Sequence, residues 1–344
     1  MSQPVRLALI GCGRISQVAH LPALEKADGI QLVAVSDPSE NVLHAVARRY
    51  EVPRAYADHS QVLADELVEA VLVAAPDRFH YPITAAALSA GKHVLVEKPL
   101  ASTADESAKL VDLVEQTGLV LQVGAMKRHD PGVQYARRFL SEGLGEVRSF
   151  NAWYRIGDLR PVIEATLFPR LYADITARQA EMAIKADRRR YLLATHGAHV
   201  FDTVRYLLGD IASVIARHRA DGQDQLWQLL LTTRSGALGT VSITVDVPGE
   251  PNEGIVIFGS AGTIKLDIPF PFYRLASTVR AYSGGETITL TPTDGDAYRR
   301  QAEAFARVIR NNGRPTPDVY DGLAALKLIE ATAAAVERGD EVTI

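Results

Sequence analysis

The sequence has few features that mark a secreted, metal-binding or membrane-spanning protein. Its 344 residues contain one cysteine, Cys12, which excludes an internal disulfide framework and a cysteine-based zinc cluster. No run approaches the ~20 apolar residues that a membrane span needs, and residues 1–10 are too short for the apolar part of a signal peptide. The net charge of −4 gives no general attraction to nucleic acid or to an anionic membrane. We therefore expect a cytoplasmic protein with a small-molecule partner and with neither nucleic acid nor membrane partners.

A glycine-containing turn follows the first expected strand, residues 5–10, and opens the first helical pattern. Gly11 permits a tight turn, Gly13 lets a pyrophosphate approach the backbone, and the small Ser16 permits close packing of helix on strand. N–H groups at the start of such a helix attract anions. The pattern predicts a phosphate-binding loop with four candidate ligand-binding residues: Gly11, Gly13, Arg14 and Ile15.

The second expected strand, residues 31–37, ends in Asp37. A carboxylate at this distance after a glycine loop accepts a hydrogen bond from a ribose 2′-hydroxyl. The carboxylate also repels a 2′-phosphate, and Pro38 and Ser39 follow it instead of a lysine or an arginine. These residues predict that the cofactor is NAD rather than NADP.

Residues 1 to about 124 alternate expected strands and helices. The strands are short and almost continuously apolar, as in residues 70–75, and one expected helix, residues 102–117, precedes a glycine at position 118. Such strands separated by helices imply a parallel sheet that is covered on both faces. Residues 1–124 are therefore predicted to form a doubly wound Rossmann domain of the α/β class.

The pattern changes after Gly124. A helix at 131–142, a strand at 147–156 and one long helix at 192–208 precede several strands between 213 and 290, joined by short turns that carry glycine or proline. Consecutive strands with short turns indicate an open antiparallel sheet. Residues 125–344 are therefore predicted to form an α+β domain with a large, open, mostly antiparallel sheet, and its two closing helices could pack back on the first domain.

Glu97, Lys98 and Pro99 stand at the end of the fifth expected strand. In doubly wound folds the ligand lies outside the carboxyl ends of the strands. Lys98 is therefore a candidate donor that positions a substrate oxygen. The alternative interpretation is a surface lysine that pairs with Glu97.

A second set of polar residues lies on the expected helix 192–208. Thr195 and His199 are four residues apart and share a helix face, and a histidine can accept a hydroxyl proton near neutral pH. The alternative interpretation of His199 is a core or capping histidine. His196, His199 and Asp202 recur every three residues, but their directions spread over roughly 120°, so we expect no metal site.

The basic segment between residues 160 and 190 resists assignment. It holds Arg160, Arg170, Arg178, Lys185 and the triplet Arg188-Arg189-Arg190. The triplet could select an anionic substrate group, or it could form a solvated or inter-subunit surface.

The ordered set of these motifs resembles one known family. Gly11-x-Gly13-x-x-Ser16, Asp37, Ala75-Pro76-x-x-x-His80, Glu97-Lys98-Pro99 and Gly197-x-His199-x-x-Asp202 occur in the order and spacing of the Gfo/Idh/MocA oxidoreductases, a family of sugar and cyclitol dehydrogenases and reductases. The glycines of Gly259-x-x-Gly262 also match, and the resemblance covers nearly the whole chain.

The resemblance implies hydride transfer between a nicotinamide and a secondary alcohol carbon. It implies that Lys98 holds the reacting oxygen and that His199 is the acid/base. Thr195 is a further candidate catalytic residue, and Thr195 and His196 are candidate substrate contacts beside them. Further cofactor contacts are implied for residues after the fourth and fifth strands: Ala75, Pro76, His80, Glu97 and Lys98. The open sheet would form the interface of a homodimer or homotetramer.

One position departs from the family pattern. Many members carry an aspartate where Thr195 stands, and a hydroxyl cannot hold negative charge near neutral pH. His199 then lacks one support for its protonated form, unless another acid supplies it. Three functions stay open: an NAD-dependent dehydrogenase of sugars, glycosides or cyclitols, a ketosugar reductase that uses NAD(P)H, and a non-catalytic NAD-binding sensor. Lys98 and His199 favour the enzymes, whereas Thr195 is the one residue that favours the sensor.

Overall fold

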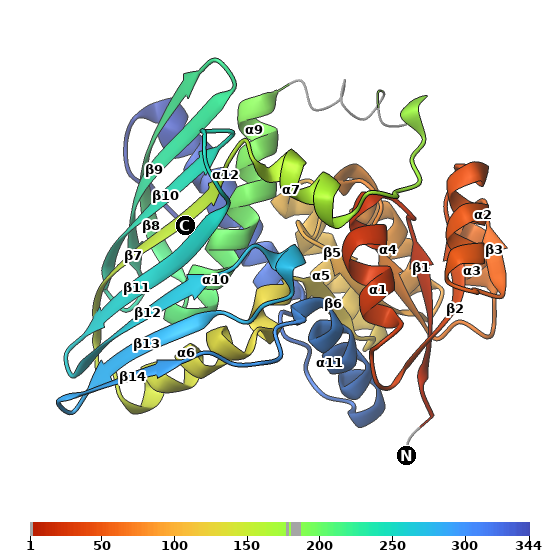
Figure 1. The fold of residues 1–344 in the computed structure, drawn as a ribbon, viewed down its shortest axis with the longest axis horizontal. Helices are drawn as coiled ribbons and strands as arrows, with labels where there is room; N and C mark the ends of the chain where they lie inside the picture. Colours follow the sequence, from red (N-terminus) through yellow and green to blue (C-terminus); the bar gives the residue numbers. More distant parts are fainter. Residues whose placement is uncertain (1–2, 177–178, 180–186) are drawn as a thin grey trace. The chain divides into compact units, whose positions relative to one another are not determined.

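The computed structural model describes residues 3–176, 179 and 187–344, and these divide into two compact units (Figure 1). The first unit comprises Met1–Met126, Phe168–Asp187 and Tyr298–Leu326, and the second comprises Lys127–Leu167, Arg188–Ala297 and Lys327–Ile344. The two units therefore do not meet at one boundary in the sequence, because two segments from the second half of the chain belong to the first unit. Arg178 and Lys185 of the basic segment lie outside the described residues. In the part of the chain that is described, no helix is both long and apolar enough to cross a membrane.

The first unit is built on a parallel sheet with strand order β3-β2-β1-β4-β5-β6. Its described strands are β1 (Val5–Ile10), β2 (Ile30–Ser36), β3 (Arg54–Tyr56), β4 (Ala70–Val73), β5 (His93–Glu97) and β6 (Leu121–Gly124). All residues of β4 and β6 are buried, as expected for strands covered on both faces. The strand order reverses where β1 lies between β2 and β4, which is where this architecture binds dinucleotides. The predicted Rossmann architecture is confirmed.

Helical segments of the first unit connect these strands. They are η1 (Ser16–His20), α1 (Leu21–Leu24), α2 (Glu40–Arg49), α3 (His59–Ala64), η2 (Asp77–Phe79), α4 (His80–Ser89), α5 (Ala104–Thr117) and α11 (Ala297–Asn311). The sequence analysis missed α3, although Asp58 caps it by accepting from the Ser60 N–H at 2.7 Å. Gly118 ends α5 in the left-handed conformation, as predicted.

Helix α11 belongs to the core of the first unit although it lies near the end of the chain. Its Ala302, Phe305 and Ile309 share one buried cluster with Leu7 and Leu9 of β1. This packing explains why residues 298–326 belong to the same compact unit as the Rossmann sheet.

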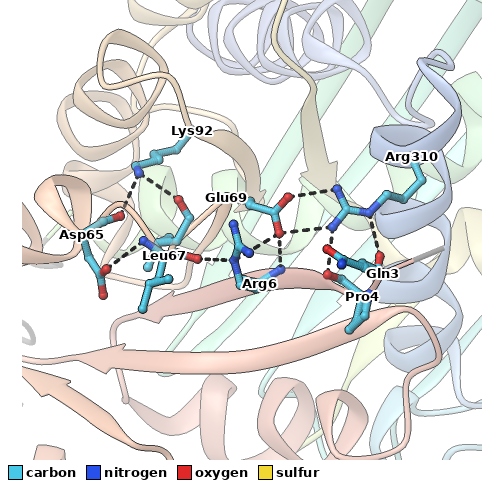
Figure 2. A network of polar contacts seen from close by, with 9 residues as sticks. Gln3, Pro4, Arg6, Asp65, Leu67, Glu69, Lys92 and Arg310 are labelled. Atoms are coloured by element: carbon cyan, nitrogen blue, oxygen red, sulfur yellow. Dashed lines mark hydrogen bonds and ion pairs between the residues drawn. The ribbon is translucent and has the colours of Figure 1, made fainter.

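A polar network also ties α11 to the start of the sheet (Figure 2). The Arg310 guanidinium donates to both carboxylate oxygens of Glu69, at 3.0 and 3.1 Å, and to the carbonyls of Gln3 and Pro4, both at 2.8 Å. The Arg6 N–H donates to the same carboxylate at 3.0 Å. Burial opposes the charge on Glu69, but the hydrogen bonds from Arg310 and Arg6 and their charges hold the pKa of its carboxyl below the ordinary value.

The second unit is built on a mostly antiparallel sheet with strand order β14-β13-β12-β11-β7-β10-β9-β8-β15. Its described strands are β7 (Val147–Ile156), β8 (Ile211–Asp221), β9 (Asp224–Thr233), β10 (Leu238–Val245), β11 (Asn252–Gly259), β12 (Gly262–Ile268), β13 (Thr278–Ser283), β14 (Glu286–Leu290) and β15 (Val342–Thr343). The pair β7–β10 is parallel, whereas the other described pairs of this sheet are antiparallel. Buried and accessible residues alternate along β9, so one face is covered and the other is open. The predicted fold class is confirmed.

Helices α6 and α10 lie on the covered face of this sheet, where α6 contacts β12 and β13 and α10 contacts β7 (Figure 1). The remaining helical bounds are η3 (Met126–His129), α6 (Pro131–Glu142), α7 (Arg160–Leu167), α9 (Arg188–Leu192), η4 (Leu193–Gly197), α10 (Ala198–Leu208), η5 (Pro271–Tyr273) and α12 (Val319–Arg338). The prediction of one regular helix at 192–208 was wrong in detail, because η4 is a π-helical turn that contains Thr195 and His196. The α-helical spacing assumed for Thr195 and His199 is interrupted there.

Candidate active site

The glycine loop after β1 has the geometry that a close ligand approach requires. Gly11 has φ of +95°, and a Cβ on it would lie 2.7 Å from the carbonyl oxygen of Ala74, so no other residue fits. A Cβ on Gly13 would meet no described atom within 4 Å. Ser16 is fully buried and donates to the Gly11 carbonyl at 2.5 Å. The other candidate loop residues lie at the surface: Gly13 and Arg14 are exposed and Ile15 is half-buried.

Asp37 follows β2 and is joined to that loop by hydrogen bonds. Its Oδ2 accepts from the Cys12 N–H at 2.8 Å, and its Oδ1 accepts from the Ser39 N–H at 2.9 Å. Burial raises the pKa of Asp37; the two N–H donors oppose that rise, and the charge of Asp174 adds to it. Each oxygen keeps a lone pair that can accept from a ribose hydroxyl. The open Gly13 and this anchored carboxylate fit a dinucleotide cofactor.

His80 begins α4 and connects the ends of two strands. Its buried ring places Nε2 2.9 Å from the carbonyl oxygen of Ala75, after β4, and Nδ1 2.6 Å from that of Pro99, after β5. A carbonyl only accepts, so both contacts are hydrogen bonds at once only when the imidazole is protonated. Both ring nitrogens of His80 are thus engaged with backbone, while Pro76 beside Ala75 is exposed. The predicted cofactor contacts of these three residues stay predictions.

Glu97 at the end of β5 is buried against His20 of η1. His20 Nε2 and Glu97 Oε1 are 2.7 Å apart, and both side chains are almost fully enclosed. The His20 ring also packs edge-on against Tyr298, with centroids 5.2 Å apart. Burial would raise the pKa of Glu97, but the hydrogen bond from His20 and the charges of His20, Lys98 and His80 hold it below the ordinary value.

Lys98 follows this buried pair directly. Its N–H donates to Glu97 Oε2 at 3.1 Å, its peptide bond to Pro99 is cis, and its side chain is half-buried. The Glu97 carboxylate is buried against His20, and the charge of Lys98 also acts on it. Both interpretations of Lys98, a substrate donor and a lysine paired with Glu97, therefore stay predictions. The sequence analysis missed His20; its one signal was a histidine inside the apolar run that follows the glycine loop.

In the second unit, the predicted histidines contact a tyrosine of β7. The Tyr154 ring is nearly parallel to the His199 ring, with centroids 5.6 Å apart and planes at 10°, and its hydroxyl lies 3.5 Å from Nδ1 of the buried His196. Lys127 Nζ lies 4.9 Å from the Tyr154 ring centroid and pairs with the buried Glu253. Burial raises the pKa of both Tyr154 and Glu253, so Tyr154 stays a neutral phenol. Tyr154 is a second residue that the sequence analysis missed, because nothing in the strand pattern distinguishes it.

Asp202 has a partner that the helix spacing did not suggest. The Arg128 guanidinium binds it with Nη2 2.7 Å from Oδ1 and Nε 3.0 Å from Oδ2, and both side chains are buried. Across the described residues no group of three or more histidine, cysteine, aspartate or glutamate side chains has an arrangement that could hold a metal.

Arginines of the basic segment also have partners within the second unit. Arg188 pairs with Asp246 and donates to the Gln223 carbonyl at 3.1 Å, and Arg160 donates to Glu164 at 2.8 Å.

Comparison with known families identifies both halves of the chain. Residues 5–125 match the oxidoreductase family with an NAD-binding Rossmann fold, and residues 133–265 match the GFO/IDH/MocA C-terminal domain. The chain belongs to the Gfo/Idh/MocA oxidoreductase family.

Named relatives align along nearly the entire chain. The chain is 27% identical to the D-xylose 1-dehydrogenase (NADP(+)) 2 of Haloferax volcanii, with 98% of both chains covered. It is 27% identical to the inositol 2-dehydrogenase 2 of Saccharopolyspora erythraea, with 99% of this chain and 95% of the relative covered. A levoglucosan dehydrogenase solved in complex with NADH has the same fold, with a TM-score of 0.82 and 20% identity over 99% of both chains.

Proposed function

We propose that this Gfo/Idh/MocA protein oxidises a secondary hydroxyl of a sugar, glycoside or cyclitol and passes the hydride to NAD⁺. The observation that carries the proposal is the anchored carboxylate of Asp37 beside the open Gly13 in a chain with both family domains. The named relatives act on a pentose, an inositol and an anhydrosugar, which supports a polyol or carbohydrate substrate.

NAD⁺ rather than NADP⁺ is the proposed cofactor. The relatives differ in this respect, since one is named for NADP⁺ and another was solved with NADH. Asp37 favours NAD⁺ because its carboxylate can accept from a 2′-hydroxyl and repels a 2′-phosphate. Gly13, Arg14 and Ile15 would supply backbone N–H groups for the pyrophosphate. The Gly11 N–H donates to the Ser36 carbonyl at 2.8 Å, so Gly11 contributes the tight turn instead.

The reaction splits a C–H and an O–H bond of the substrate alcohol. Bound NAD⁺ supplies a hydride acceptor at carbon 4 of the nicotinamide. Lys98 donates a hydrogen bond to the reacting oxygen and stabilises the negative charge that develops there. His199 accepts the hydroxyl proton, so that the alcohol leaves as a ketone or lactone.

Thr195 and His196 are proposed to contact other substrate hydroxyls. The aspartate that many family members carry at position 195 is absent, and the aromatic stack with Tyr154 supports the orientation of His199 in its place. Tyr154 is held in turn by its contact with His196 and by the charge of Lys127 near its ring.

The proposal is tested by mixing the protein with NAD⁺ or NADP⁺ and a panel of inositols, aldoses, glycosides, uronates and anhydrosugars. The absorbance at 340 nm then measures the reduced cofactor that forms. We expect NADH formation with one class of ring polyol. Lys98→Met should lower kcat by roughly 10²-fold or more, whereas Lys109→Met, on the exposed part of α5, should not. If NAD⁺ binds but no compound of the panel yields NADH, the proposed oxidation of a polyol is refuted. Normal turnover of Lys98→Met would also refute the proposed reaction.

We also propose that the open face of the second sheet joins two copies of the chain. Leu238, Phe258 and Tyr282 fall in one row across β10, β7, β11, β12 and β13, and they are 53%, 39% and 49% exposed. Large apolar side chains in one exposed row indicate an interaction surface. Light scattering should give a dimer or tetramer, and Leu238→Arg should shift it toward the monomer; a monomeric wild type would refute this interface.

A further inference from the structure

Part of the basic segment is attached to the helix of the dinucleotide loop. The Gln17 amide group pairs with the backbone of Tyr172: Nε2 donates to the carbonyl at 2.8 Å, and Oε1 accepts from the N–H at 2.9 Å. These residues are 155 positions apart in the sequence, and both belong to the first unit. Residues 171–174 have no helix or strand of their own, so this pair fixes their position.

The attachment continues through hydrogen bonds to Asp37. The buried Gln17 also donates through Nε2 to the Cys12 carbonyl at 2.9 Å. The Cys12 N–H donates to Asp37 Oδ2 at 2.8 Å. One chain of hydrogen bonds thus runs from the Tyr172 backbone through Gln17 and Cys12 to the carboxylate that is expected to bind the ribose.

A second attachment comes from α2, the helix that follows Asp37 in the sequence. Arg49 Nη1 donates to the Arg170 carbonyl at 3.2 Å. This contact is exposed, so it is weaker than the buried one at Gln17. Residues 170 and 172 are therefore bound to two helical elements of the first unit, α2 and η1.

We propose that residues 170–174 form part of the ribose site of the cofactor, and that Asp174 is a second residue that selects NAD⁺ over NADP⁺. This inference rests on the proposed NAD-binding function and extends it to a segment outside the usual strand-end loops. Asp174 and Asp37 together oppose a 2′-phosphate, which carries between one and two negative charges near neutral pH.

The charges of the two carboxylates interact across this site. Burial is the main cause of the raised pKa of Asp37, and the charge of Asp174 raises it further. A group that disfavours the nearby carboxylate also disfavours a phosphate at the same place, because both are anions. A 2′-hydroxyl suffers no such penalty and can donate to either carboxylate.

Direct binding of the two dinucleotides to the full-length protein, measured by calorimetry without substrate, tests the inference. Asp174→Asn should lower the ratio of Kd for NADP⁺ to Kd for NAD⁺ by about three- to tenfold. Asp221→Asn, which removes the same charge from an exposed hairpin of the second unit, should leave the ratio unchanged. Asp37→Asn should lower the ratio at least as much as Asp174→Asn.

A matched pair of variants tests the attachment itself. Tyr172→Pro removes the N–H that donates to Gln17, whereas Tyr172→Ala keeps it. Both variants lose the phenol, so their difference reports the backbone contact. Tyr172→Pro should show the lowered ratio of Asp174→Asn, and Tyr172→Ala should keep the higher ratio.

The outcomes separate this inference from the proposed function. An unchanged ratio in Asp174→Asn together with a lowered ratio in Asp37→Asn would overturn the role of Asp174 and leave the NAD site standing. Equal ratios in the proline and alanine variants would overturn the attachment through Gln17. A wild type that binds neither dinucleotide would overturn both proposals.

Discussion

The buried pair of His20 and Glu97 allows a prediction that does not depend on the substrate. His20→Leu removes the donor 2.7 Å from Glu97 Oε1 and leaves the carboxylate buried with the hydrogen bond from the Lys98 N–H. Removing a hydrogen-bond donor from a buried carboxylate costs about 3 kcal/mol in the free energy of unfolding. We expect that loss at pH 8, where Glu97 is ionised in the folded wild type.

The loss should shrink as the pH falls, and its sign follows from the pKa of Glu97. In the wild type this pKa lies below the ordinary value, so the pair stabilises the fold above that value and Glu97 stays ionised from pH 8 to pH 5. Without His20, burial dominates and raises the pKa of Glu97 above the ordinary value. The buried carboxyl then takes up a proton as the pH falls through that raised pKa, and each further pH unit lowers the penalty by about 1.4 kcal/mol. The destabilisation of His20→Leu relative to wild type should therefore be smaller at pH 5 than at pH 8.

Urea denaturation at pH 5 and pH 8 measures this change, with the double variant His20→Leu/Glu97→Gln as control. The double variant has no carboxyl to titrate at position 97, so its difference from wild type should not increase between pH 5 and pH 8. A destabilisation of His20→Leu that is equal at both pH values would refute the reasoning, because it would show that Glu97 is not the titrating group.

Three further predictions concern other contacts. Arg310→Met should destabilise the fold by about 2 kcal/mol at pH 7 in urea denaturation. The loss should shrink as the pH falls through the lowered pKa of Glu69, because the protonated carboxyl no longer stabilises the fold; a loss that stays equal as the pH falls would contradict the role of Glu69. Tyr154→Leu should lower kcat by about tenfold through loss of the stack on His199. Tyr154→Phe keeps the ring, so its kcat should stay within about threefold of wild type. The kcat values of the two variants and their pH profiles test the role of the ring, and equal losses of kcat would contradict it. Gly11→Ala should abolish NAD⁺ binding in calorimetry, because its Cβ would strike the backbone after β4; retained affinity would show that the loop can shift.

The strands, turns and helix ends could be predicted where the interactions that determine them involve residues close together in the sequence. The apolar runs of the six parallel strands, the tight turn at Gly11 and the helix end at Gly118 each follow from local backbone preferences and burial patterns. The predictions failed where the signal was weak or nonlocal. The short α3 depends on the Asp58 cap more than on a hydrophobic stripe, and the π-helical turn η4 interrupts a segment that reads as one regular helix.

The partners of the candidate site residues could not be predicted in the same way. Glu97 pairs with His20, Asp202 with Arg128, and Tyr154 stacks on His199, although these partners lie between 45 and 77 positions apart. A sequence shows which side chains can donate or accept, but the same donor fits many acceptors. Which pair forms depends on how strands and helices bring distant segments together.

The sequence by itself determined the glycine loop, the carboxylate after the second strand, and Lys98 and His199 as candidates for the chemistry, because each depends on local geometry or on residue type. Only the tertiary structure decided what surrounds them. It buried Glu97 with His20, placed Tyr154 on His199, and attached Tyr172 to the dinucleotide loop through Gln17. The physical reason is that hydrogen bonding and packing act over a few ångströms in space, whatever the separation along the chain.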